Sequence, residues 1–314
     1  MGLFHCPVGA AFRSGEGCID CGMCVARTRE ERKRSADAVR RFLRSESSAR
    51  LERYVIRKIA VSGKGGVGKS TLTALFAVAL RDMGYEVLVI DADASNSGLN
   101  RKLGIAALPE PLLSLVPGFG DGKELPADWL TADEIALEDV PSPFVAEDGR
   151  LLYMTAGKLE DALEGCACTI ADVAKTFLSK VRLTDRQIIL IDNEAGVESF
   201  GRGLEQLVDT VLIVTEPSFD SIAVTAKIRA MAEGLGIRRI RAVVNKTRDA
   251  QTEKTVFRKL AEQDVRYLGV LRSDDALLES GLLGIPAPEG ASKEAAERLV
   301  RLMLDEAEMP YNPI

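Results

Sequence analysis

The stretch SGKGGVGKST, residues 62–71, decides the fold of this chain. It follows a short apolar run at 58–62 and opens a helical pattern that ends at Gly84. The spacing G-x-x-x-x-G-K-[ST] is met by Gly63, Gly68, Lys69 and Ser70. A strand, a glycine-rich loop and a helix in this order are typical of a loop that binds the phosphates of a nucleotide.

The chemistry of this loop needs these residue types. Glycines let the backbone bend, so that its N–H groups and the helix N-terminus surround the phosphates. Lys69 is expected to neutralise the β- and γ-phosphates, and the Ser70 hydroxyl to ligate Mg²⁺. We therefore predict ATP or ADP with Mg²⁺ as ligands, and the predicted contacts are Gly63, Gly65, Gly66, Gly68, Lys69, Ser70 and Thr71.

Short apolar runs alternate with helical patterns along the rest of the chain. The runs are EVLVIDAD at 86–93, QIILIDNEAG at 187–196, TVLIVTEP at 210–217, RIRAVVNK at 239–246 and RYLGVL at 266–271. This alternation predicts an α/β fold with a mostly parallel sheet and helices on both faces. The segment 104–150, rich in proline and acids, interrupts the pattern. It is either a loop with short helices or an insert for interactions.

Composition narrows the class of protein. The 41 lysines and arginines against 47 acids give a net charge of −6, which argues against general nucleic-acid binding. The first residues do not have the pattern of a signal peptide, and no apolar run approaches the ~20 residues of a membrane span. We expect a cytoplasmic protein that binds neither membrane nor nucleic acid.

Carboxylates follow two of the predicted strands. Asp91 and Asp93 come at the end of the second strand, and Asp192 ends another. Ligands bind at the carboxyl edge of a parallel sheet, so these groups are expected at the nucleotide. Asp192 is placed to hold Mg²⁺ through water.

The sequence GCACT at 165–169 carries two cysteines, Cys166 and Cys168. In extended backbone residues i and i+2 point the same way, whereas in a helix they diverge, so the pair is predicted to be non-helical. A disulfide within the pair would be strained, and a metal at ~2.3 Å from each sulfur is easier. A two-fold homodimer would supply the missing two thiolates. The alternative is two small buried cysteines or a redox pair.

The N-terminal 56 residues have a composition of their own. They contain Cys6 and then the C-x2-C-x2-C series of Cys18, Cys21 and Cys24. So short a segment seldom folds without a metal or disulfide. The spacing favours a 4Fe–4S cluster, with zinc or no metal as alternatives. A basic helix is predicted near 29–44, either solvated or docked on an acidic partner. We predict two domains, this extension at 1–56 and a P-loop ATPase domain at 57–314.

An additional lysine, Lys64, makes the loop resemble the deviant P-loop of the family that includes MinD, ParA, ArsA and the nitrogenase iron protein. The resemblance implies a slow, switch-like ATPase in which Lys64 reaches across a dimer to the partner's nucleotide. Pointing to solvent is the alternative for this side chain. The resemblance also implies catalytic roles for Lys64, Lys69 and Asp93, of which Asp93 would orient the attacking water. Gly196 would face the γ-phosphate, and Asn245 the adenine.

The C-x-C pair and the later D-x-E-A-G-x-E-x-x-G-R-G segment at 192–203 are similar to the CooC family, ATPases that insert nickel into carbon monoxide dehydrogenase. This resemblance covers roughly residues 57–290. It implies that cysteines of two subunits hold Ni²⁺ and pass it to a client enzyme such as carbon monoxide dehydrogenase. Thiolates also take Zn²⁺ or copper, so the metal stays open.

CooC-like chains usually begin close to the first strand and lack this N-terminal extension. Two other functions therefore stay open. The first is an ATP-gated iron–sulfur reductase resembling the nitrogenase iron protein. Its cluster cysteines are far apart rather than in a C-x-C pair, but the N-terminal cysteines keep it open. The second is a positioning protein like MinD or ParA. The acidic C-terminus, LVRLMLDEAEMPYNPI, argues against the basic helix that MinD-like chains need.

Overall fold

The computed structural model describes residues 56–94, 98–117, 119, 125–158, 167–197, 203–237 and 239–308. Within this part, residues Arg57–Val300 form one compact unit. Several predictions fall outside the described residues and stay predictions. They concern the N-terminal domain at 1–56, the basic helix at 29–44, and the cysteines Cys6, Cys18, Cys21, Cys24 and Cys166.

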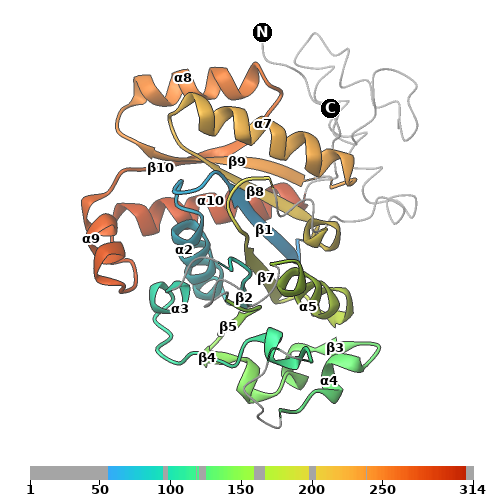
Figure 1. The fold of residues 1–314 in the computed structure, drawn as a ribbon. Coiled ribbons are helices and arrows are strands. Elements are labelled where there is room, and N and C mark those ends of the chain that lie inside the picture. Colours follow the sequence, from blue (N-terminus) through green and yellow to red (C-terminus); the bar gives the residue numbers. More distant parts are fainter. Residues whose placement is uncertain are drawn as a thin grey trace, which may run out of the picture. The chain divides into compact units, whose positions relative to one another are not determined.

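The main sheet has eight strands in the order β10-β9-β8-β1-β7-β2-β5-β4 (Figure 1). Every neighbouring pair is parallel except β4 against β5, so the predicted parallel α/β sheet is confirmed. The strands are β1 (Lys58–Gly63), β2 (Glu86–Asp91), β4 (Ala146–Asp148), β5 (Leu151–Thr155), β7 (Gln187–Asp192), β8 (Thr210–Thr215), β9 (Arg239–Thr247) and β10 (Tyr267–Arg272). A separate pair joins β3 (Ile135–Ala136) to β6 (Val181–Arg182).

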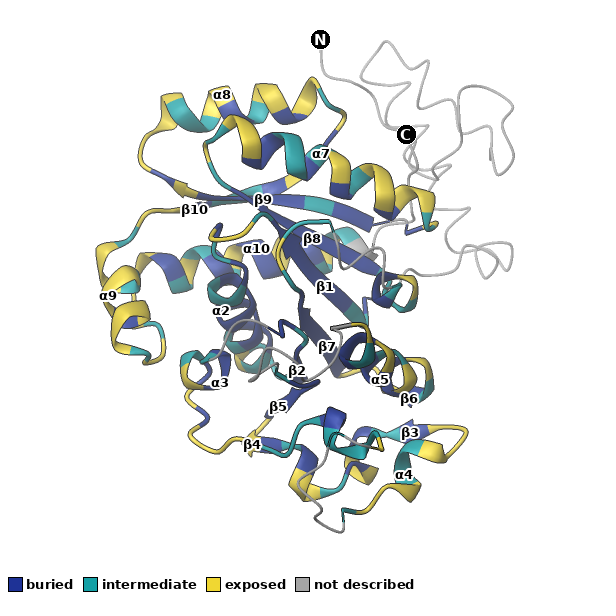
Figure 2. Cartoon of the chain, viewed as in Figure 1, coloured by how far each residue is buried: buried dark blue, intermediate teal, exposed yellow. Residues whose placement is uncertain are grey.

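Helices cover both faces of this sheet. They are α2 (Lys69–Asp82), α5 (Ala167–Lys180), α7 (Phe219–Gly234), α8 (Ala250–Ala261), α9 (Asp275–Leu283) and α10 (Ala291–Glu308). The connection from β1 through α2 to β2 moves along the sheet toward β4. The connections through α5 (β5 to β7), α7 (β8 to β9) and α8 (β9 to β10) move toward β10. Right-handed crossovers therefore place α2 on one face and α5, α7 and α8 on the opposite face. The covered central strands are buried (Figure 2). No helix of the described part is long and apolar enough to cross a membrane.

The segment 104–150 is a loop with short helices that packs into the core. It follows α3 (Leu99–Lys102) and contains η3 (Leu112–Leu115), α4 (Asp128–Thr131), η4 (Leu137–Asp139), η5 (Ser142–Phe144), β3 and β4. Phe144 is fully buried in one apolar cluster with Phe177 of α5, and the Trp129 ring lies 5.6 Å and 6.0 Å from these two rings. The segment thus completes the apolar layer over β2, β5 and β7.

Candidate active site

The loop between β1 and α2 has the glycine conformations that its sequence predicts. Gly63, Gly66 and Gly68 have φ values of 150°, 79° and 98°, which L-residues rarely adopt. A Cβ at Gly63 would lie 2.4 Å from the Val214 carbonyl oxygen, because β8 passes directly beside the loop. The glycines therefore allow close backbone approach as well as the turn.

The N-terminus of α2 has the features of an anion-binding site. The helix starts directly after Gly68, no side chain caps its first N–H groups, and its first turn contains no acid. Ser70 and Thr71 lie in this first turn. Uncapped N–H groups and the positive end of the helix dipole favour a phosphate here.

Lys69 is a buried cation at this helix start, with only 7% of its surface exposed. Burial lowers the pKa of its ammonium group, and the carboxylates of Asp192, Asp93 and Glu194 oppose that shift. The lysine predicted from the motif is thus under the electrostatic influence of Asp192 and Asp93, two of the acids predicted from the strand ends. The arrangement holds a positive charge where phosphate oxygens would enter.

Asp192 and Ser70 lie together beside Lys69, as a Mg²⁺ site requires. Burial raises the pKa of the Asp192 carboxyl to about 7, although a hydrogen bond from Ser70 opposes the shift. Thr73 Oγ1 lies 3.4 Å from Asp192 Oδ1. A hydroxyl and a carboxylate are hard oxygen ligands, so these residues fit Mg²⁺ bound with water and phosphate.

The raised pKa of Asp192 has a consequence for the nucleotide-free protein. Between about pH 4 and pH 7 the folded state keeps a proton that the unfolded chain has lost, so the free energy of unfolding should fall as pH rises. The slope from this group is at most about 1.4 kcal/mol per pH unit. Urea unfolding in EDTA from about pH 5 to pH 8 should show a flatter profile for Asp192→Asn. Parallel profiles for the two proteins would contradict this assignment.

Gly196 lies against the phosphate loop. Its N–H donates to the Gly63 carbonyl at 2.9 Å, and a Cβ built at Gly65 would contact Ala195 at 3.6 Å. The predicted contact between the Gly196 N–H and a γ-phosphate stays a prediction, and it requires this hydrogen bond to open.

Lys64 extends from the loop with 39% of its side chain exposed. Its Nζ lies 3.6 Å from Asp220 Oδ2 on α7, and that carboxylate is 75% exposed. Exposed ion pairs contribute little to stability. Lys64 can therefore exchange this partner for a stronger anion at small cost.

Asn245, on strand β9, is hydrogen-bonded to the phosphate loop. Its side chain is buried, its Nδ2 donates to the Val67 carbonyl at 2.8 Å, and its Oδ1 accepts from the Lys246 N–H at 2.9 Å. Both ends of the amide thus contact protein. The adenine contact stays a prediction, and what the structure shows is a hydrogen bond from Asn245 to the loop.

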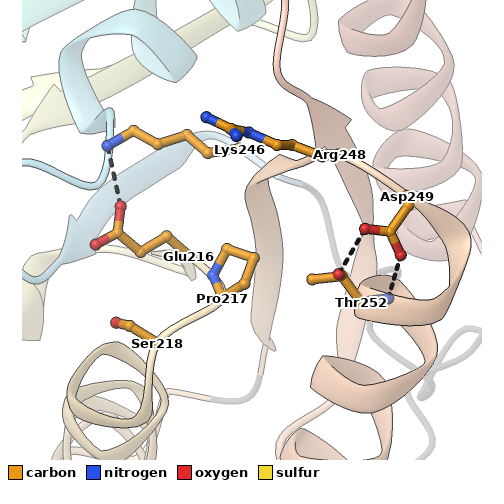
Figure 3. Close-up of a pocket in the computed structure, with 7 residues that line it drawn as sticks. All are labelled: Glu216, Pro217, Ser218, Lys246, Arg248, Asp249 and Thr252. Atoms are coloured by element: carbon orange, nitrogen blue, oxygen red, sulfur yellow. Dashed lines mark hydrogen bonds and ion pairs between the residues drawn. The ribbon is translucent and has the colours of Figure 1, made fainter.

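A pocket of about 310 Å³ opens beside the loop at the carboxyl ends of β8 and β9 (Figure 3). Lys246 connects the pocket to the loop, since its Nζ donates to the Gly66 carbonyl at 2.5 Å and pairs with Glu216 at 3.0 Å. The pocket residues are Glu216, Pro217, Ser218, Lys246, Arg248, Asp249 and Thr252. Sequence reasoning missed them, although they lie at the ends of the predicted runs 210–217 and 239–246 or within a few residues after them.

Cys168 departs from the conformation predicted for the cysteine pair. Helix α5 begins at Ala167, so Cys168 is helical and exposed in its first turn. The prediction of a non-helical pair is therefore wrong for Cys168. The apolar side chains of α5 pack into the core from Ile170 onward, and this packing favours a helix that includes Cys168. Within the described residues, no three or more His, Cys, Asp or Glu side chains are grouped to hold a metal ion.

A second missed feature is the partner of Asp91. Asp91 is 2% exposed, and its carboxylate contacts Lys158 Nζ at 2.7 Å and the Tyr153 hydroxyl at 3.0 Å. Burial raises the pKa of this carboxyl, and Lys158 opposes the shift. Lys158 Nζ also donates to the Asp93 carbonyl at 2.5 Å. A lone lysine after a strand gives no motif, so the sequence offered no signal for it.

Comparison with known proteins places this site in a family. Residues 58–287 match the CobQ/CobB/MinD/ParA nucleotide binding domain. An uncharacterized ATP-binding protein of Methanocaldococcus jannaschii is 32% identical over 72% of this chain and 92% of its own length. The carbon monoxide dehydrogenase accessory protein CooC of Rhodospirillum rubrum is 31% identical over 79% of this chain and 96% of its own length.

The fold is similar to solved structures of the same group. The septum site-determining protein MinD of Pyrococcus horikoshii, complexed with Mg-ADP, aligns with a TM-score of 0.60 and 25% identity. That alignment covers 80% of this chain and 97% of the other. The phosphate loop, the buried lysine and the strand-end acids agree with the family match. The chain belongs to the CobQ/CobB/MinD/ParA family of nucleotide-binding proteins and is a P-loop ATPase.

Proposed function

We propose that the chain is an ATP-dependent metallochaperone that carries nickel on Cys166 and Cys168 and delivers it to an enzyme such as carbon monoxide dehydrogenase. One observation carries the proposal. The ATPase unit presents a cysteine, Cys168, at the exposed start of α5, in a C-x-C pair with Cys166. The 31% identity to CooC supports the choice of nickel enzyme.

The metal site would be shared between two copies of the chain. Two thiolates are too few for a soft metal that prefers four ligands, and a two-fold axis doubles the set. Lys64 supports this arrangement, because its exposed and weakly paired ammonium is free to approach the partner's phosphates. Nickel is here the cargo, and Zn²⁺ is the alternative cargo.

The nucleotide would occupy two adjoining regions. The phosphates bind at the α2 N-terminus with Mg²⁺ on Ser70 and Asp192, and the base enters the pocket beside Pro217 and Arg248. A volume of about 310 Å³ is at the lower end of the range of ligand pockets. The buried lysine and the strand-end acids supply positioning and charge neutralisation, which phosphoryl transfer chiefly requires.

An anaerobic Ni²⁺ titration with and without MgATP tests the proposal. The wild-type protein should bind about one Ni²⁺ per dimer, and MgATP should change the affinity about tenfold, a typical coupling between sites. A Cys166→Ser/Cys168→Ser variant should lose this binding while it keeps its ATPase activity. Sedimentation of the same samples gives the dimer fraction.

The N-terminal cysteines provide the matched control. A variant with Ser at Cys6, Cys18, Cys21 and Cys24 should retain the nucleotide-dependent nickel site. Nickel binding that survives loss of Cys166 and Cys168, or that ignores nucleotide, would contradict the proposal. An ATP-gated redox protein centred on the N-terminal cysteines would then be favoured.

A further inference from the structure

Lys158 joins two parts of the molecule that the proposed function must connect. Its ammonium group contacts the Asp91 carboxylate at 2.7 Å and the Asp93 carbonyl at 2.5 Å. Asp91 is paired in register with Asp192 on the neighbouring strand β7, and Asp93 lies near Lys69. The ammonium group of Lys158 is therefore bound to the Asp91–Asp93 loop, which is expected to face the phosphates.

The backbone beside Lys158 is packed close to the start of α5. Gly157 has φ 152° and is so closely packed that a Cβ would lie 2.9 Å from Leu113 Cβ and 3.4 Å from Ile170 Cγ1. Ile170 is two residues after Cys168 on the same helix. Leu113 is tied to the same strand end, because its N–H donates to the Ala156 carbonyl at 2.9 Å. There is little free space for this strand end to move without moving the first turn of α5.

The strand end is also tied to β2. The Ala156 N–H donates to the Asp91 carbonyl at 2.9 Å, and Lys158 adds a charged contact to the same residue. Asp91 is almost fully buried, so the ion pair has little competition from water. A shift of the Asp91–Asp93 loop on nucleotide binding would thus be carried into residues 156–158.

We propose that Lys158 is a positioning residue that couples the Asp91–Asp93 loop to the first turn of α5, so that the exposure of Cys168 depends on the bound nucleotide. The inference rests on the proposed function only in taking this cysteine as part of the metal site. It assigns Lys158 no contact with substrate. Its role is to transmit the state of the loop.

Thiol alkylation tests the coupling without any metal. In a full-length Cys166→Ser background, Cys168 is the only thiol between residues 25 and 314, and mass spectrometry can follow its reaction with iodoacetamide. MgATP or MgATPγS should change the alkylation rate about fivefold or more relative to MgADP, the lower end of typical coupling. Lys158→Met should reduce this change to less than about twofold.

Two further variants separate coupling from a structural role. Lys158→Arg keeps the charge at Asp91 and should retain most of the response. Tyr153→Phe removes the hydroxyl that donates to Asp91 but leaves the contacts of Lys158 with Asp91 and Asp93 in place, and it should keep the response. If Lys158→Met fails to fold, the double variant Lys158→Met/Asp91→Asn removes both charges of the ion pair. This double variant should still show no nucleotide-dependent change in the alkylation rate of Cys168.

The outcomes are distinct. An unresponsive wild type, a response retained in Lys158→Met, or a response restored by the Lys158→Met/Asp91→Asn pair would overturn the inference. The inference would also be overturned if Tyr153→Phe lost the nucleotide-dependent change in alkylation as fully as Lys158→Met. Nucleotide-dependent alkylation that needs Lys158, in a protein that binds no Ni²⁺, would leave this coupling standing and reject the proposed function instead.

Discussion

Replacement of Lys69 by methionine should lower kcat/KM for ATP by about 10²–10³-fold, the usual loss when one preorganised hydrogen-bond donor is removed from a reaction site. Lys69 is 7% exposed, and the carboxylates of Asp192, Asp93 and Glu194 act on its charge. Without the ammonium group these acids would face the phosphates alone. The pKa of Asp192 would rise further, because Lys69 is one of the groups that lower it. Steady-state release of phosphate at saturating Mg²⁺ measures the effect.

The chain offers a matched control for this substitution. Lys227 is an exposed lysine on α7, and Lys227→Met removes the same charge and adds the same side chain away from the site. It should leave kcat/KM within about twofold, as surface substitutions usually do. Circular dichroism of both variants checks the fold. Activity within about tenfold of wild type in Lys69→Met would mean that another cation performs this role.

Much of the nucleotide site follows from the sequence because its parts are local. Gly63, Gly68, Lys69 and Ser70 lie within eight residues, and their spacing alone predicts a strand, a loop and a helix start. Asp192 could be placed beside them because carboxyl ends of parallel strands meet at one edge of the sheet. Neither the prediction of the loop nor the placement of Asp192 depends on the order of the strands in the sheet.

The features that the sequence did not predict are long-range contacts. Lys158 contacts Asp91 across 67 positions, and Asn245 contacts Val67 across 178. Neither pair has a spacing that could be recognised, since the sheet order brings them together. The helical state of Cys168 was missed for another reason. The pairwise geometry of the thiols favoured extended backbone, but the packing of α5 fixes the conformation at this position.

Gly63→Ala should lower the free energy of unfolding by about 3 kcal/mol, from backbone strain together with overpacking. Gly63 has φ 150°, and a Cβ would lie 2.4 Å from the Val214 carbonyl oxygen and 3.1 Å from Val67 Cγ2. The carbonyl belongs to the strand β8, which pairs with β1 at this point, so it cannot move aside as a flexible side chain would. The Gly63 carbonyl also accepts the Gly196 N–H, and this contact should be disturbed as well. Urea unfolding of the nucleotide-free protein measures the loss.

Gly65→Ala is the matched control, because it adds the same methyl group two residues later in the same loop. Among the described residues, a Cβ at Gly65 meets only Ala195 Cβ at 3.6 Å, which is an ordinary van der Waals distance. Its unfolding free energy should change by less than about 0.5 kcal/mol, as at other permissive positions. Equal destabilisation by both alanines would mean that any methyl group in the loop is harmful. A large loss confined to Gly63→Ala would instead establish that this glycine is required by the close approach of β8, in addition to its place in a phosphate-binding motif.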